Sequence, residues 1–349
     1  MVVIDMSREA IIGESFGDKP TFDEKLQTLI DGSIRRNFDP LVDIPWNDPE
    51  YAMDPMHPGW ELPEGIDLGA DEWYHDQPVE RRREIGMRRM INIAKVGPHF
   101  ERPLVAAIQA YGLKQPNGSL KAKYADLEAR EEINHIRMFE ELVHRSDLDV
   151  EGARKMFRTI VPLVTPFGPY IPSAMMTTVL AGEEPIDHIQ KDIWRQSDKI
   201  HPAMRDVMAI HVAEEARHIS FAHEYLEETV PQLSTRDQVS LAAYTPAIMY
   251  TMARAIVRPS PGELEKMQIP MEVRKRLWFG SVAGKRLLAS LFSDARMLAE
   301  NTGIKTPEGG KKTFVSAIGD IGWKAFGIDG RASRYRSEPD RTHAVATSR

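Results

Sequence analysis

One arrangement of carboxylates and imidazoles occurs twice along this chain. Each half carries a lone Glu and, at nearly equal distance further on, a Glu followed three residues later by a His: Glu101, Glu132 and His135 in the first half, and Glu183, Glu215 and His218 in the second. A Glu on one helix and a Glu-x-x-His on the next, used twice, is how four-helix bundles hold two adjacent metal ions. Carboxylate and imidazole donors suit iron or manganese. The repeat therefore predicts an all-α fold around a dinuclear metal site.

Two other Glu-x-x-His pairs lack this context. Glu72 and His75 lie in a stretch rich in Pro, Gly and Asp, where we expect no helix to hold them in phase. Glu141 and His144 follow the first pair by nine residues, which is about half a rotation of an α-helix. We expect this later pair to face away from the metal site.

A third imidazole shares the helical face of the second pair. His211, Glu215 and His218 follow one another at spacings of four and three residues, which places them on one side of a helix. We therefore interpret His211 as a metal ligand rather than as a packed imidazole. The adjacent acids Glu131 and Glu214 break the three-residue step to His, so we do not predict them as ligands.

Two acids compete for the ligand position on the third metal-binding helix. Glu183 shares its helical stripe with apolar residues, whereas Glu184 lies among charged residues on the wetter side. Glu183 is therefore the predicted ligand. Acids that hydrogen-bond the far side of a ligating His fix its ring. The candidates for that role are Asp126, Asp187 and Glu214, and the sequence does not choose among them.

The composition argues against several classes of site and partner. The chain has no cysteine, which excludes disulfides and thiolate metal sites. Its net charge is −7 and no basic block interrupts its core, so we expect no nucleic-acid partner. The N-terminus lacks the apolar core of a signal peptide. Residues 159–182 are uncharged, but prolines break their first half. We interpret them as a Pro-rich connection and expect a cytoplasmic protein without a membrane span.

Four segments are predicted along the chain. An irregular N-terminal segment wraps the bundle, and it is followed by a helical metal-binding domain, a short C-terminal helical extension and a disordered tail: residues 1–78, 79–300, 301–330 and 331–349. Helical patterns and start signals predict helices near residues 21–35, 79–112, 118–146, 172–196, 199–229, 236–257 and 270–300. Strand-like alternation is nearly absent.

With these residues identified, the chain resembles the AurF-type diiron N-oxygenases, which include p-aminobenzoate N-oxygenases and belong to the ferritin-like superfamily. The family holds its two iron ions with four carboxylates and three imidazoles, and its additional His lies four residues before the last ligating Glu. The resemblance covers residues 80–230. It implies the ligand set Glu101, Glu132, His135, Glu183, His211, Glu215 and His218.

The resemblance implies a diiron oxygenase that uses O2 to oxidise a small organic molecule. The expected reaction is N-oxygenation of an (aryl)amine to a hydroxylamine, nitroso or nitro product. The expected cofactors are two Fe ions, with Mn as the alternative metal, together with O2 and an external electron donor such as a separate reductase. We also expect a homodimer. The turns before Glu101 offer no pair of Tyr and Arg to clamp an aromatic acid, which argues against an aminobenzoate substrate.

Two alternatives remain open at this stage. One is a diiron C–H hydroxylase or desaturase that acts on an acyl or polyketide chain, because acyl-carrier-protein desaturases have a similar ligand pattern. His211 favours the N-oxygenase branch over that one. The other is a non-catalytic ferritin-like iron protein, which the long N-terminal segment disfavours.

Overall fold

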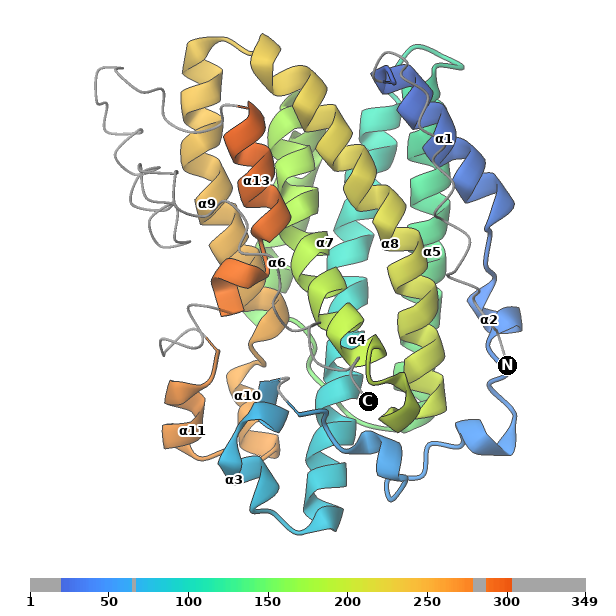
Figure 1. The fold of residues 1–349 in the computed structure, drawn as a ribbon, viewed down its shortest axis with the longest axis vertical. Coiled ribbons are helices and arrows are strands. Elements are labelled where there is room, and N and C mark those ends of the chain that lie inside the picture. Colours follow the sequence, from blue (N-terminus) through green and yellow to red (C-terminus); the bar gives the residue numbers. More distant parts are fainter. Residues whose placement is uncertain (1–19, 65–66, 279–286, 303–349) are drawn as a thin grey trace, which may run out of the picture.

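The computed structural model describes residues 20–64, 67–278 and 287–302, and every regular element within those ranges is a helix (Figure 1). Four long helices pack as a bundle: α4 (Val79–Gly112), α5 (Leu120–Ser146), α7 (Pro172–Trp194) and α8 (Pro202–Thr229). A further long helix, α9 (Thr235–Val257), packs along α7. This arrangement confirms the predicted all-α, ferritin-like four-helix bundle with additional helices.

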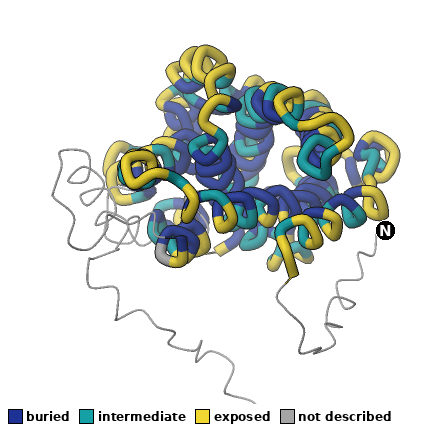
Figure 2. Tube along the Cα trace, turned by 90° about the horizontal axis from the view of Figure 1, so that it is seen from above, coloured by how far each residue is buried: buried dark blue, intermediate teal, exposed yellow. Residues whose placement is uncertain are grey.

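The inner sides of the bundle helices are formed mostly by buried residues. Viewed from above, the buried residues lie on the inner sides of the helices and the exposed residues form the outer rim (Figure 2). Most buried residues are apolar, but a group of Glu and His side chains from α4, α5, α7 and α8 is buried among them. Buried charges are rare unless they are paired or bind a metal, so this group marks the functional centre of the bundle.

Helix-start residues fix the ends of the bundle helices. Ser119 accepts a hydrogen bond from the backbone N–H of Ala122 at the start of α5, and Ser234 caps α9 in the same way. Pro172 and Pro202 occupy the first positions of α7 and α8, where a missing N–H carries no cost. The observed bounds of these bundle helices lie within a few residues of the predicted ones.

Prolines also lie inside two bundle helices, next to predicted ligands. Pro98 and Pro103 flank Glu101 in α4, and Pro185 follows Glu183 in α7. Both helices continue through these positions, so none of the three prolines marks a helix end. Each proline nevertheless removes one backbone donor from the helix beside a ligand.

The predicted helix at 270–300 is wrong. The chain instead forms α10 (Pro261–Lys266), α11 (Met271–Arg276) and α13 (Ser293–Thr302). Helix α11 stops because Leu277 is extended, with ψ of 167°, and Trp278 has a positive φ of 56°. A helix cannot continue through an extended residue followed by a left-handed one. The predicted extension and tail, 301–330 and 331–349, lie outside the described residues except for the last two residues of α13.

The N-terminal segment packs on the outside of the bundle. Helix α1 (Phe22–Arg35) begins with a capping box and lies against α5 and α8, and α2 (Pro40–Asp43) lies against α5. Short turns follow: η2 (Pro49–Tyr51), η3 (Pro58–Trp60), η4 (Asp67–Ala70) and α3 (Glu72–His75). The fully buried Trp60 stacks on His201 beside α8 at 4.1 Å. These contacts attach the segment to the bundle at several points.

The connection between α5 and α7 is more helical than the sequence suggested. Helix α6 (Lys155–Val164) includes Pro162, and the 3-10 helix η5 (Thr165–Tyr170) follows it. One proline removes a single backbone donor, which does not prevent a short helix here. Across the described residues, no helix is both long and apolar enough to cross a bilayer.

Candidate metal centre

The predicted ligands meet at mid-height in the bundle. Each comes from one of the bundle helices α4, α5, α7 and α8, and all are almost completely buried: Glu101, Glu132, His135, Glu183, His211, Glu215 and His218. The two Glu-x-x-His pairs that the sequence analysis ruled out as ligands lie away from this group. His144 is exposed and Glu141 bonds to Arg145 at 2.6 Å. His75 is exposed, although its segment does form one helical turn, α3.

One group of donors is rich in nitrogen. Single donor atoms of Glu101, His135 and His211 all lie within 4.8 Å of one another. His211 Nε2 lies 3.3 Å from Glu101 Oε1 and 3.2 Å from Glu215 Oε1. His135 Nδ1 lies 3.3 Å from the same Glu215 oxygen. Two imidazoles and a carboxylate therefore surround one position that a metal ion can occupy.

A second group is rich in oxygen. Glu128, Glu132 and His218 also bring donor atoms within 4.8 Å of one another. His218 Nδ1 lies 2.9 Å from Glu132 Oε1 and 3.3 Å from Glu215 Oε2. The carboxyl group of Glu183 is within hydrogen-bonding reach of Glu215. Glu132 and Glu215 face both groups, which is the position of carboxylates that bridge two metal ions.

The sequence prediction missed Glu128. It lies four residues before Glu132, at the spacing by which His211 precedes Glu215. The phase argument that identified His211 therefore applies to it equally. Glu128 is 2 % exposed, and burial raises its pKa to about 8.

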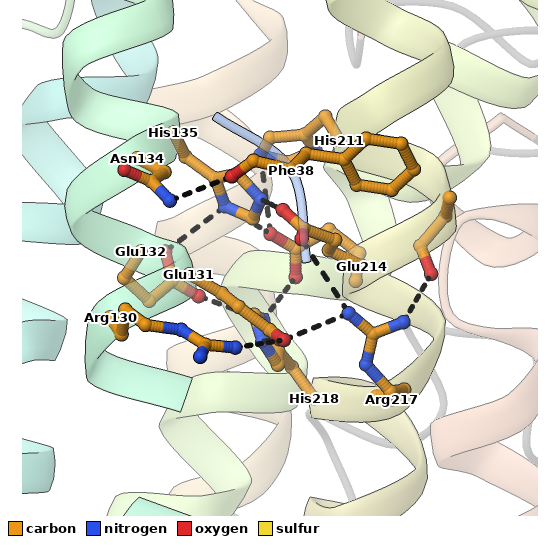
Figure 3. Close-up of polar contacts among 12 residues, drawn as sticks. Phe38, Arg130, Glu131, Glu132, Asn134, His135, His211, Glu214, Arg217 and His218 are labelled. Carbon is orange, nitrogen blue, oxygen red and sulfur yellow. Dashed lines mark hydrogen bonds and ion pairs between the residues drawn. The ribbon is translucent and has the colours of Figure 1, made fainter. Parts of the chain in front are cut away.

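Two acids form hydrogen bonds with the histidine rings. In each case the acid and the ring come from different helices of the bundle (Figure 3). His135 Nε2 on α5 lies 2.9 Å from Glu214 on α8, and His218 Nε2 on α8 lies 2.9 Å from Glu131 on α5. Arg217 donates to Glu131 at 2.9 Å and lies 3.6 Å from Glu214. With Nε2–H donating to these acids, Nδ1 of each ring is free to face a metal.

Of the three acids considered for this supporting role, only Glu214 has it. Asp126 accepts a hydrogen bond from Gln109 at 3.3 Å, and Asp187 pairs with Lys191 at 2.7 Å. The missed partner, Glu131, is the residue that corresponds to Glu214 in the other half. The doubled acid of Glu-Glu-x-x-His, present in both halves, was the signal for it.

A close approach of α4 and α5 contributes to the geometry of the site. Gly97 lies one turn before Glu101, and a Cβ there would be 2.5 Å from the ring of Phe139. That ring in turn lies 5.0 Å from the ring of His211. Any larger residue at position 97 would separate the two helices that carry Glu101 and His135.

The buried carboxylates of the cluster repel one another when no cation is present. Burial and the nearby Glu132 raise the pKa of Glu101 well above its usual value, and burial and Glu215 do the same for Glu183. Burial lowers the pKa of His211 to about 3, so its imidazole is neutral. Neutral imidazole is the form that binds metals.

Several buried donor atoms have no hydrogen bond within the described part of the chain. They include Glu101 Oε2, Glu132 Oε2, His135 Nδ1 and Glu215 Oε1. A buried polar atom without a partner is costly, and metal ions at the two positions would satisfy all four. The donor set therefore fits a dinuclear metal site.

A cleft of about 1170 Å³ reaches this centre. Its walls come from α4, α6, α7 and α9 and are mostly apolar, including Phe100, Met175 and Val179. The ligand Glu183 also lines the cleft, although it is 6 % exposed. The oxygen-rich side of the centre is thus open to a bound molecule.

Comparison with known families agrees with this geometry. The family described as P-aminobenzoate N-oxygenase AurF matches residues 19–303. The chain belongs to this family. The match confirms the resemblance first suggested by the ligand spacing, and it extends over nearly all of the described helices. All of the predicted ligands, together with Glu128, Glu131 and Glu214, lie inside the region that matches AurF.

Close relatives of this AurF-family chain exist in mycobacteria. It is 45 % identical over 329 residues to the uncharacterized proteins MT0908 and Rv0885 of Mycobacterium tuberculosis, and to the same extent to Mb0909 of Mycobacterium bovis. The alignments cover 94 % of this chain and 94 % of each relative. No solved structure gives a significant match.

Proposed function

We propose that this protein is a dinuclear non-haem iron oxygenase that transfers oxygen from O2 to the nitrogen of an amine. The observation that carries the proposal is the convergence of four carboxylates and three imidazoles on two adjacent positions, in a chain of the AurF family. His135, His211 and Glu101 would hold one iron, His218 and Glu183 the other, and Glu132 and Glu215 both. Glu128 is a further candidate ligand of the iron near His218. Two iron ions held in this way would supply the activation of O2.

The residues of the chain perform the remaining tasks. Glu131 and Glu214 fix the ligating rings by accepting hydrogen bonds from their Nε2–H groups. The apolar wall of Phe100, Met175 and Val179 excludes water and favours an uncharged amine, whose nitrogen lone pair is then available. Because Glu183 is the ligand that lines the cleft, the substrate would approach the centre on that side.

The proposal includes an electron donor, because reduction of O2 by repeated turnover consumes electrons that the iron pair must regain. We propose a separate reductase for this role and a homodimer as the assembly. Manganese remains the alternative metal, since the same donors suit it.

A second candidate function has one observation in its favour. The cleft is long and apolar, which suits hydroxylation or desaturation of an acyl or polyketide chain at the same centre. The two reactions differ in their products, so one assay separates them. A purely storage role gives no account of a cleft that ends at a ligand.

The test begins with reconstitution of the protein with Fe²⁺ in the absence of air. About two iron ions per chain are expected. O2 and reductant are then added with a panel of arylamines, alkylamines and acyl thioesters, and the products are identified by mass spectrometry. Oxygen added to an amine nitrogen supports the proposal. Products oxidised only at carbon would establish the second candidate, and an iron content near zero would overturn both.

A further inference from the structure

The cleft that reaches Glu183 is far larger than a single aromatic ring requires. Its volume is about 1170 Å³, whereas a cavity of about 150 Å³ already accommodates benzene. Apolar side chains from α6 to the start of α7 line it and are strongly exposed: Met156, Ile160, Phe167, Tyr170 and Ile171. An exposed apolar surface of this kind indicates a binding site for an apolar group.

Two arginines line one part of this cleft, and a third lies near them. Arg154 immediately precedes α6 and Arg254 lies in the last turn of α9, and both line the cleft. Arg258 immediately follows α9. Burial, and then the charges of Arg258 and Arg254, lower the pKa of Arg154. The three guanidinium groups are therefore close enough to repel one another.

No counter-charge accompanies these cations in the part of the chain that the structure describes. The Nε atoms of Arg154 and Arg258 are buried and make no hydrogen bond. Arg254 donates to the neutral hydroxyl of Tyr250 at 3.1 Å, and Arg258 lies 6.0 Å from the ring centroid of Trp278. The three side chains are partly buried, and a cation held partly out of water is stabilised by pairing with an anion. The arginine fork matches carboxylate and phosphate groups, so a ligand carrying either would complete the cluster.

An aromatic wall connects this cluster to the metal centre. Phe157 lies three residues after Arg154 and stacks on Phe100 at 4.3 Å, and Phe100 directly precedes the ligand Glu101. Arg154, Phe157, Phe100 and Glu183 line the same cleft. A ligand with its anionic group at Arg154 would therefore lie along the aromatic wall and extend toward Glu183.

We propose that Arg154, Arg254 and Arg258 bind the anionic group of the substrate, which is an amphiphile with an apolar body and a carboxylate or phosphate at the end remote from the metal centre. The identification of this ligand as the substrate rests on the proposed function. The predicted lack of a Tyr and Arg pair just before Glu101 does not conflict with it, because these cations come from α6 and α9.

The test measures binding of three chain-matched probes to the metal-loaded protein without O2: dodecanoate, dodecyl phosphate and dodecanol. At least one anion should bind about tenfold or more tightly than dodecanol. Arg154→Gln and Arg254→Gln should each weaken anion binding about tenfold and leave dodecanol unaffected. The matched control is Arg236→Gln, because Arg236 also lines the cleft but is exposed. It should change none of the affinities. The tighter anion identifies the group that the cluster recognises.

A structural role for the arginines predicts a different result. It would lower the melting temperature of Arg154→Gln, whereas loss of one charge from an unpaired cluster should leave the melting temperature unchanged or raise it. Equal binding of dodecanol and both anions, or unchanged anion binding in both variants, would overturn the proposal. Because binding is measured without O2, an enzyme that fails to oxygenate amines but keeps the anion preference would refute the proposed function alone.

Discussion

The two halves of the metal centre are built alike but differ at one position. In each half a lone Glu and a Glu-x-x-His face inward, and the acid before the inner Glu supports the His of the opposite half. Four residues before the inner Glu, however, α5 carries Glu128 and α8 carries His211. One half offers an additional carboxylate and the other an additional imidazole, and both are buried.

This single difference makes the two metal positions unequal. The group of donors near His135 and His211 has two nitrogen donors, whereas the group near His218 has one, with the carboxylates of Glu128 and Glu183 around it. Carboxylates favour harder, more positively charged metal states than imidazoles do. The oxygen-rich position is also the one next to the cleft. The two halves thus share one arrangement of ligand candidates, and the residue that differs makes the two groups of donors chemically unequal.

The largest expected effect comes from a residue common to both halves. Glu215 faces both groups of donors, so Glu215→Ala should reduce the metal content from about two ions per chain to near zero. Elemental analysis after reconstitution measures this directly. The matched control is His144→Ala, since His144 belongs to an exposed Glu-x-x-His pair on α5. If His144→Ala lost as much metal, the assignment of the buried pairs would be wrong.

The next effect tests the inequality itself. His211→Ala should weaken binding at the nitrogen-rich position and Glu128→Gln at the oxygen-rich one, each by about 10- to 100-fold. A Co²⁺ titration followed by absorbance resolves the two positions through their different ligand fields. The expected outcome is that each variant alters a different binding step. A shared effect on one step would show that the positions are equivalent or that only one of these residues is a ligand.

The supporting acids should have smaller and nearly equal effects. Glu131→Gln and Glu214→Gln keep the shape of the side chain but weaken the hold on His218 and His135, which should cost about tenfold in metal affinity each. Competition with a chelator of known affinity measures the loss. Asp126→Asn is the control, because Asp126 accepts a hydrogen bond from Gln109 rather than from a histidine of the centre. Unequal losses would reveal an asymmetry beyond Glu128 and His211.

The smallest expected effect is on the pH dependence of stability in the metal-free protein. It has opposite signs at the equivalent positions Glu128 and His211. The pKa of Glu128 is raised to about 8, so its contribution to stability is present below the unfolded value, near 4.5, and is lost as the pH rises toward 8. The pKa of His211 is lowered to about 3. Its contribution is present above the unfolded value, near 6.5, and is lost as the pH falls.

Urea unfolding of chelator-treated protein at pH 5 and pH 8 measures both contributions. In the unsubstituted protein, Glu128 lowers the free energy of unfolding as the pH rises from 5 to 8, and Glu128→Gln should abolish this decrease. His211 raises the free energy of unfolding as the pH rises through the acid part of this range, and His211→Gln should abolish this increase. Changes of the same sign in the two variants would contradict the different charge states assigned to these positions.

The sequence was most informative where chemistry repeats at a fixed helical phase. The spacing of Glu132, His135, Glu215 and His218 was enough to predict four helices and a buried polar centre. Glu128 has the same helical phase as His211. A Glu on a helix is usually solvated, however, so its residue type alone did not indicate a buried position. The arginine cluster could not be predicted, because its members come from distant segments and no local pattern joins them.

The remaining errors concern segments whose structure depends on tertiary contacts. Residues 159–182 contain enough proline to look irregular, yet α6 forms where its apolar side chains meet the cleft. Residues 270–300 have helical composition, yet the chain turns at Leu277 and Trp278, and the Trp278 side chain is buried. Burial of one large side chain can outweigh a weak helical preference.

The crossed support of the two histidines has a consequence for assembly. His135 depends on an acid from α8, and His218 on an acid from α5. An isolated α4–α5 hairpin, or an isolated α7–α8 hairpin, would present its ligands without the partner that orients their rings. The donor set that fits two metal ions is therefore complete only when the two hairpins have docked.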